Sequence, residues 1–506
     1  MNNSRLKNSS YNVFFNILQL LVTTILTFVT RTFFIRYLGK EMLGLDGLFT
    51  NILSMLSLTE LGIGTAISFS LYKPLAEGDY EKVSCLMTLY KKMYRIIAIV
   101  ILVIGLLLLP ILPIISKGYT GGSLYLYYLV YLVNTVFSYL LTYKGPLITA
   151  DQHEYKLFWN QLLFTVVMYV LQIVVLIKVK SFMYYLLVML ITNFLRNLIN
   201  NIYITKLYKN IDFSKNQKVD KQTINTITQN VKNMFISRIG DYLLNGTDNI
   251  IISAIDITLT GIYSNYLAIV GVMKTLINAI YNGVTASFGN VMAIEKQDVQ
   301  ENVFKISTFI CFLISGLITL ELIFLFNPFI RLWAGKDYLV SFKLSIVIAL
   351  NFYFYSNHIS LNSLKMASGH YKADRYVAII QAIVNLAVSI VLGYYIGLSG
   401  VILGTLVSYL TVGFIFRPLL LIKSIFNKSA FEYFFEQAKY GMTLLVVFII
   451  NYILYRYINL DTNIITILFK GSIVAIIYFV IVSILFNQNK SFKYLIGLIK
   501  NKISRE

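Results

Sequence analysis

Charged side chains interrupt several apolar stretches of this chain, and their chemistry suits an anionic ligand. Arg31, Arg238 and Lys274 each stand inside a run of apolar residues. A charge in lipid is costly unless it faces water or a partner, so these cations are candidates for a functional site. Arg offers a planar fork to phosphate or carboxylate, and Lys offers a point charge. The alternative is that such groups only join helices by hydrogen bonds.

Polar residues also recur three or four positions apart, which places them on single faces of the apolar helices. Arg238 and Asp241 are one helical turn apart, so they either bind a ligand or neutralise each other. Glu60 either pairs with a cation such as Arg31 or titrates. The residues that we expect to line a shared cavity are Arg31, Arg36, Glu60, Arg238, Asp241, Asn245, Asp248, Lys274, Asn278, His358 and Lys365.

The composition places these helices in a membrane. Of the 506 residues, 57% are hydrophobic and 13% are charged, and the mean hydropathy is +0.71. A soluble protein has about 25% charged residues. The first apolar run is too long for a cleavable signal and ends at Arg31 and Arg36, so we expect a first spanning helix.

Fourteen segments are long and apolar enough to span a bilayer, which needs about 20 residues each. They are 12–35, 43–71, 94–116, 123–144, 157–177, 183–205, 231–255, 260–290, 303–327, 340–364, 376–396, 398–421, 440–458 and 465–486. With the N-terminus inside, 29 Lys and Arg fall on the cytoplasmic side and 10 outside. This bias predicts that both termini are cytoplasmic. It also accounts for most of the net charge of +20, so no nucleic-acid partner is expected.

An internal repeat relates the two halves of the chain. His153 and His370 stand in similar segments, and the same sequence offset separates the helix starts at Gly44 and Gly261. This offset spans an even number of helices, which predicts a parallel repeat with a substrate site between the halves. The predicted division is a six-helix lobe at 1–205, a cytoplasmic linker at 206–230, a second lobe at 231–425, and two further helices with a tail at 426–506.

The chain lacks motifs for common catalytic sites. No phosphate-binding G-x-x-x-x-G-K-[ST] motif occurs, and the three histidines are not spaced as a zinc site. We therefore expect no enzyme activity, no metal and no cofactor.

Three stretches carry a resemblance to a known family. They are FIRYLGKEMLGLDGLFTNILSMLSLTELGIGTAISFSLYKPLAEGD, LLNGTDNIIISAIDITLTGIYSNYLAI at 243–269 and ASGHYKADR at 367–375. They resemble Wzx-type polysaccharide-unit flippases of the multidrug/oligosaccharidyl-lipid/polysaccharide (MOP) exporter superfamily. The resemblance extends to the end of the second predicted lobe and implies an all-α membrane protein with a cationic lumen between two lobes.

The implied function is transport. The family moves undecaprenyl-diphosphate-linked oligosaccharide from the cytoplasmic to the outer leaflet of the bacterial inner membrane, for capsule, O-antigen or exopolysaccharide synthesis. Expected partners are that glycan, the lipid bilayer, H+ or Na+, a polysaccharide polymerase and a chain-length regulator. The alternatives are a lipid II flippase, a drug or cation antiporter of the same superfamily, and a membrane glycan polymerase.

Overall fold

The computed structural model describes residues 3–57, 63–213, 225, 229, 246–370, 373–457 and 463–503. Helices make up 89% of the structure, and no strand occurs in these ranges. The all-α prediction is therefore confirmed. The chain divides into two compact units, Met1–Gly261 and Ile262–Glu506, and each is treated by itself below. The four-part division made from the sequence stays a prediction.

Unit 1 contains helices that begin and end at recognisable signals. Asp79 caps one helix, because its carboxylate accepts the Lys82 backbone N–H at 2.9 Å. Asp256 caps another by accepting from the Thr258 N–H at 2.7 Å. The helices are α1 (Asn3–Leu56), α2 (Ile63–Glu77), α3 (Tyr80–Leu107), η2 (Leu109–Ile111), α4 (Leu112–Ile115), α5 (Leu124–Thr142), α6 (Gly145–Ala150), η3 (Glu154–Leu157), α7 (Phe158–Lys178), α8 (Phe182–Leu207) and the start of α10 (Ile257–Ile294).

Unit 2 contains the rest of α10 and the helices after it. Ser341 and Asn463 cap α12 and α16, because their side chains accept from the Leu344 and Thr466 N–H groups at 3.2 and 2.8 Å. The helices are α11 (Gln297–Trp333), η4 (Lys336–Tyr338), α12 (Phe342–Ser368), α13 (Val377–Ser408), the π-helix η5 (Tyr409–Gly413), α14 (Phe414–Phe426), α15 (Phe431–Tyr457), α16 (Ile464–Leu485) and α17 (Lys490–Ile503).

Nine helical stretches of the described chain are long and apolar enough to cross a membrane, which indicates a multi-pass membrane protein. Two of them join two expected spans: 377–426 covers both 376–396 and 398–421, and 14–56 covers 12–35 and the first part of 43–71. Kinks separate the two parts: Gly39 has φ 77°, and Gly397 has φ 59°. Glycine adopts this left-handed region at little cost. Helices α10 and α12 match two further spans, and the span expected at 231–255 lies largely outside the described residues.

Amide side chains join α8 to α5 in unit 1. Asn193, Asn197 and Asn201 stand four residues apart on α8 and donate to Asn134, Ser138 and the Leu141 carbonyl of α5, at 3.3, 3.4 and 2.6 Å. This spacing keeps the three amides on one helix face. Such interhelical hydrogen bonds stabilise helix pairs in membranes, so this face has a structural role.

Two glycines bring α1 and the start of α10 into backbone contact within unit 1. A Cβ on Gly44 would lie 2.1 Å from the Ile257 carbonyl oxygen, and a Cβ on Gly261 would lie 1.9 Å from the Lys40 carbonyl oxygen. The sequence offset between Lys40 and Ile257 equals the offset between Gly44 and Gly261. The contact is therefore reciprocal, which is what a two-fold relation between repeat copies produces.

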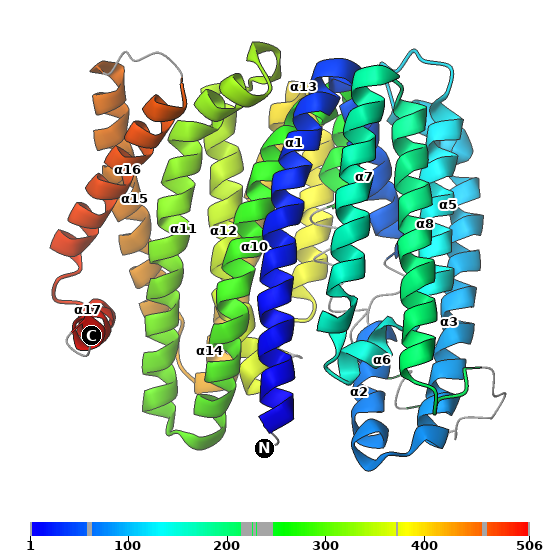
Figure 1. The fold of residues 1–506 in the computed structure, drawn as a ribbon. Coiled ribbons are helices and arrows are strands. Elements are labelled where there is room, and N and C mark those ends of the chain that lie inside the picture. The colour runs from blue at the N-terminus through cyan, green and yellow to red at the C-terminus, as the bar shows by residue number, and fades with distance from the viewer. Residues whose placement is uncertain are drawn as a thin grey trace. The chain divides into compact units, whose positions relative to one another are not determined.

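Aromatic packing joins α11 to the last long helices in unit 2. The rings of Phe312 and Tyr440 stack with centroids 4.3 Å apart, and the Tyr478 hydroxyl donates to the Phe312 carbonyl at 3.0 Å. Helices α11, α15 and α16 run along the length of this unit, whereas α17 lies across the end of α16 (Figure 1). Helix α17 therefore turns away from the direction of the spanning helices instead of continuing α16.

Candidate functional site

Four of the predicted cavity residues lie outside the described residues. They are Glu60, Arg238, Asp241 and Asn245. Whether Arg238 binds a ligand or pairs with Asp241 is therefore not tested, and both alternatives stay predictions. The structure places the other seven: three lie in unit 1 and four lie in unit 2, as the next paragraphs describe.

Arg31 belongs to a polar set inside unit 1. Its charge is close enough to act on the Asp46 carboxylate and on Tyr185, and the Tyr131 hydroxyl donates to Asp46. Asp46 and Arg31 come from the two parts of α1 on either side of the Gly39 kink, so the kink positions them. The sequence gave no local signal for Tyr131 or Tyr185, because tyrosines number 38 in this chain.

Arg36 and Asp248 have contrasting environments in the same unit. Arg36 is exposed on α1, in the turn that follows Arg31. Asp248 is buried, at 7% exposure, and its chain neighbours Thr247 and Asn249 are buried with it. A buried carboxylate is costly unless polar groups accompany it, so this polar segment suits Asp248. Both residues remain predicted cavity residues.

Lys274 and Asn278 come together on Tyr355 in unit 2. The Lys274 ammonium lies 4.2 Å from the centre of the Tyr355 ring, and the Asn278 amide donates to the Tyr355 hydroxyl at 3.1 Å. Two residues one turn apart on α10 therefore contact the same tyrosine of α12. A cation over an aromatic ring is stabilised without losing its charge. The sequence predicted Lys274 and Asn278 as cavity residues, and the structure brings both onto Tyr355.

His358 and Lys365 lie elsewhere on α12, in contact with η5 and with the segment before α13. His358 is buried, and its ring centroid is 5.2 Å from that of Tyr409 on η5. Lys365 forms an ion pair with buried Asp374, at 3.1 Å. A Cβ on Gly413 would lie 2.5 Å from the His358 ring, so glycine makes room for it. These contacts are consistent with a structural role within unit 2.

A buried lysine marks the end of α5 in unit 1, outside the spanning segment. Lys144 donates to the Asn201 amide oxygen at 2.8 Å and to the Thr205 hydroxyl, and its ammonium lies 4.4 Å from the Phe213 ring centre. Burial, and then the nearby charge of Lys91, lower the pKa of Lys144 to about 8. Phe213 belongs to the predicted linker, so this cluster attaches the start of the linker to unit 1.

The family follows from comparison with known proteins. A family model described as polysaccharide biosynthesis protein matches residues 9–288, which is more than half of the chain. The chain belongs to the polysaccharide biosynthesis protein family. Comparison with curated proteins gave no match.

Solved structures show which fold this polysaccharide biosynthesis protein has. An inward closed conformation of the lipid II flippase MurJ matches with a TM-score of 0.68 at 15% identity, covering 94% of this chain and 99% of that one. An inward-facing multidrug resistance MATE transporter of the MOP superfamily matches with a TM-score of 0.60 at 14% identity, over 82% of this chain and 99% of that one. The MOP transporter fold expected from the sequence is therefore confirmed.

A third structure adds a comparison of charge. A MOP superfamily transporter from Pyrococcus furiosus, described as having a binding pocket of reverse polarity, matches with a TM-score of 0.51 at 14% identity. The match covers 83% of this chain and 95% of that one. One fold thus accommodates binding pockets of different polarity, so the fold alone does not choose the substrate.

Proposed function

We propose that this protein is a flippase for undecaprenyl-diphosphate-linked oligosaccharide repeat units. It moves them from the cytoplasmic to the outer leaflet of the bacterial inner membrane by alternating access, with both termini in the cytoplasm. Family membership supports a role in polysaccharide synthesis, and the fold supports transport. The diphosphate carries negative charge, and Arg31 and Lys274 supply cations within the helices.

The observation that favours a flippase over a drug antiporter is the extent of the structural match. The lipid II flippase structure covers 94% of this chain, whereas the multidrug transporter structure covers 82%. The flippase therefore leaves less of this chain without a counterpart. A substrate with a glycan and a lipid also agrees with the family, because surface polysaccharides are built from such units.

The proposed energetics need no ATP. Outward movement of two negative charges across an inside-negative potential of about 100 mV releases roughly 4–5 kcal/mol. An ion-coupled step with H+ or Na+ at Asp248, Glu60 or Asp241 is the alternative route. Transport in vesicles with and without a membrane potential, at equal pH and Na+ on both sides, separates these two routes.

The test of the substrate is a gene deletion in the host. We expect loss of surface polysaccharide and accumulation of single lipid-linked repeat units, and the wild-type gene should reverse both effects. Accumulation of the peptidoglycan precursor with normal polysaccharide would instead indicate a lipid II flippase. Normal levels of both with altered drug tolerance would indicate an antiporter and would overturn the proposal.

The same host tests the predicted cations. Lys274→Met removes the charge over Tyr355, and Lys343→Met, an exposed lysine at the start of α12, is the matched control. We expect only the first variant to lower polysaccharide export at equal protein levels. Equal export by the two variants would remove Lys274 from the mechanism.

A further inference from the structure

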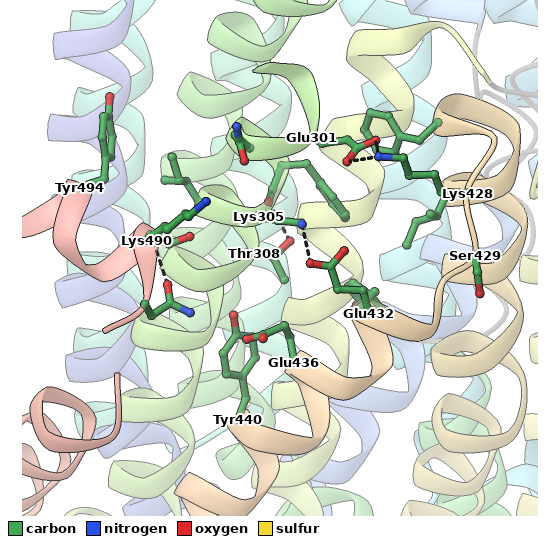
Figure 2. A pocket seen from close by; sticks show the side chains of 18 residues that line it. Glu301, Lys305, Thr308, Lys428, Ser429, Glu432, Glu436, Tyr440, Lys490 and Tyr494 are labelled. Carbon is green, nitrogen blue, oxygen red and sulfur yellow. Dashed lines mark hydrogen bonds and ion pairs between the residues drawn. The ribbon is translucent and has the colours of Figure 1, made fainter. Parts of the chain in front are cut away.

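A cavity lies at one end of unit 2, and none of the described residues that the sequence predicted for the transport site lines it. It has a volume of about 630 Å³ and lies where α11 begins, α14 gives way to α15, and α17 begins. Figure 2 shows side chains from these elements converging on it. Phe304, Phe426 and Tyr433 form an apolar wall that continues into a buried hydrophobic cluster. Most of the other lining side chains are polar or charged.

Two ion pairs stand on the cavity wall, and in each of them a lysine neutralises a glutamate. Lys305 pairs with Glu432 and joins α11 to the start of α15, whereas Lys428 pairs with Glu301 at 2.7 Å and joins α11 to the connection between α14 and α15 (Figure 2). Residues paired in this way present no net charge to a ligand. A single anion or a single cation would therefore find no excess of opposite charge among these four residues.

Two further lining residues supply an acceptor atom and a cation: Glu436 already pairs with Lys439, so it adds an acceptor oxygen and no excess negative charge. The Oε1 atom of Glu436 accepts from Lys439 at 2.8 Å, whereas its Oε2 atom is buried and has no hydrogen-bond partner among the described residues. Lys490, at the start of α17, is exposed, and the described part of the chain offers it no ion-pair partner. A ligand that carries both an N–H ammonium and an anionic oxygen would satisfy both groups.

The surroundings identify where such a ligand comes from. The sequence of helix α17 is amphipathic, and the helix lies across the end of the spanning helix α16 (Figure 1). Amphipathic helices of this kind lie in the plane of the membrane interface. Phe431 and Phe435 at the start of α15 are largely exposed, at 76% and 55%. The cavity is therefore at the depth of lipid headgroups, beside surfaces suited to acyl chains.

We propose that this cavity binds the headgroup of a phosphatidylethanolamine molecule from the surrounding bilayer. The ammonium donates to Glu436, and the phosphate accepts from Lys490. Phosphatidylcholine has a quaternary ammonium without an N–H, so it satisfies only Lys490. Phosphatidylglycerol has neutral hydroxyls in place of the ammonium, so its hydrogen bond to Glu436 is weaker than that of an ammonium. The site lies within unit 2 and does not depend on which substrate the protein transports.

The test measures lipid binding by the purified full-length protein in detergent. Palmitoyl-oleoyl phosphatidylethanolamine, phosphatidylglycerol and phosphatidylcholine are added in turn, and bound lipid is counted by native mass spectrometry alongside the unfolding temperature. We expect the first lipid to bind most tightly and to stabilise most, because binding to the folded state alone raises stability. Equal effects of all three lipids, or a preference for either of the other two, would overturn the proposal.

Three variants locate the effect. Glu436→Gln and Lys490→Gln should each weaken phosphatidylethanolamine binding about tenfold, the usual effect of losing one hydrogen bond to a charged group. Lys493→Gln, on the same helix but away from the cavity, is the matched control and should bind like the wild type. If Glu436→Gln does not fold, the exposed Lys490→Gln decides alone. Wild-type affinity in Lys490→Gln would refute the site.

Discussion

The reciprocal glycine contact in unit 1 gives the most direct test of the packing. Replacement of Gly44 by Ala places a Cβ 2.1 Å from the Ile257 carbonyl oxygen, and replacement of Gly261 by Ala places one 1.9 Å from that of Lys40. Ordinary contact begins at 3.4 Å, so the two backbones must separate to admit either methyl group. A backbone carbonyl cannot move aside by changing rotamer, as a side chain can.

The expected cost follows from two opposing terms. Overpacking of this kind costs about 1–3 kcal/mol. Alanine in place of glycine within a helix returns about 0.5–1 kcal/mol. Each variant should therefore lose up to about 2 kcal/mol, or several degrees in unfolding temperature. Since both variants disturb the same contact, the double variant should lose less than the sum of the two.

The assay compares unfolding temperatures of the purified proteins in one detergent. Gly271→Ala is the matched control, because Gly271 stands on the same helix as Gly261 and no described atom lies within 4 Å of its added Cβ. It should gain stability from helix propensity alone. If Gly44→Ala and Gly261→Ala gain as much as Gly271→Ala, the close crossing does not exist and the reasoning fails.

Three further predictions concern polar groups. Lys144 loses its proton above about pH 8 in the folded protein but only near 10.5 when unfolded, so it makes stability rise with pH across this window. Lys144→Met should make the unfolding temperature rise less between pH 8 and 10 than in the wild type, and an equal rise in both proteins would contradict this prediction. Tyr355→Phe loses only the hydrogen bond from Asn278 and should lower stability by about 1 kcal/mol. Tyr355→Leu also removes the ring under Lys274 and should lower stability by about 0.5–2 kcal/mol more. Equal unfolding temperatures for these two variants would exclude the ring contact. Glu321→Gln should raise the unfolding temperature, because the Oε2 atom of Glu321, on α11, is buried and has no hydrogen-bond partner among the described residues. A lower unfolding temperature in this variant would show that the Glu321 carboxylate has a stabilising partner.

Local sequence patterns were sufficient to predict the helices and several contacts. Apolar length marked the spans, and the helical spacing of Lys274 and Asn278 placed them on one face of α10, where both contact Tyr355. The repeat offset matched Gly44 with Gly261, and the two helices that carry them meet at these glycines. These features follow from periodicity, and periodicity is present in the sequence itself.

Other features depend on tertiary packing and gave no local signal. The spans expected at 303–327 and 440–458 belong to helices that begin at Gln297 and Phe431, because charged residues such as Glu301 and Glu432 continue the helices instead of ending them. These charges lie outside the predicted spans, and their ion pairs had no signal in the local sequence. Tyr131, which donates to Asp46, is similarly indistinguishable in sequence from the other tyrosines.

The repeat keeps its backbone contacts and changes its side-chain chemistry. At the offset that matches Gly44 with Gly261, Arg31 corresponds to Asp248 and Lys274 corresponds to Ser57. Glycines at a close crossing must be retained in both copies, because any Cβ there meets a carbonyl. A ligand with two different ends, such as the proposed diphosphate joined to a glycan, does not share the symmetry of the two copies. Different charges at equivalent positions are therefore what such a substrate requires, and a symmetric ligand would give no reason for them to diverge.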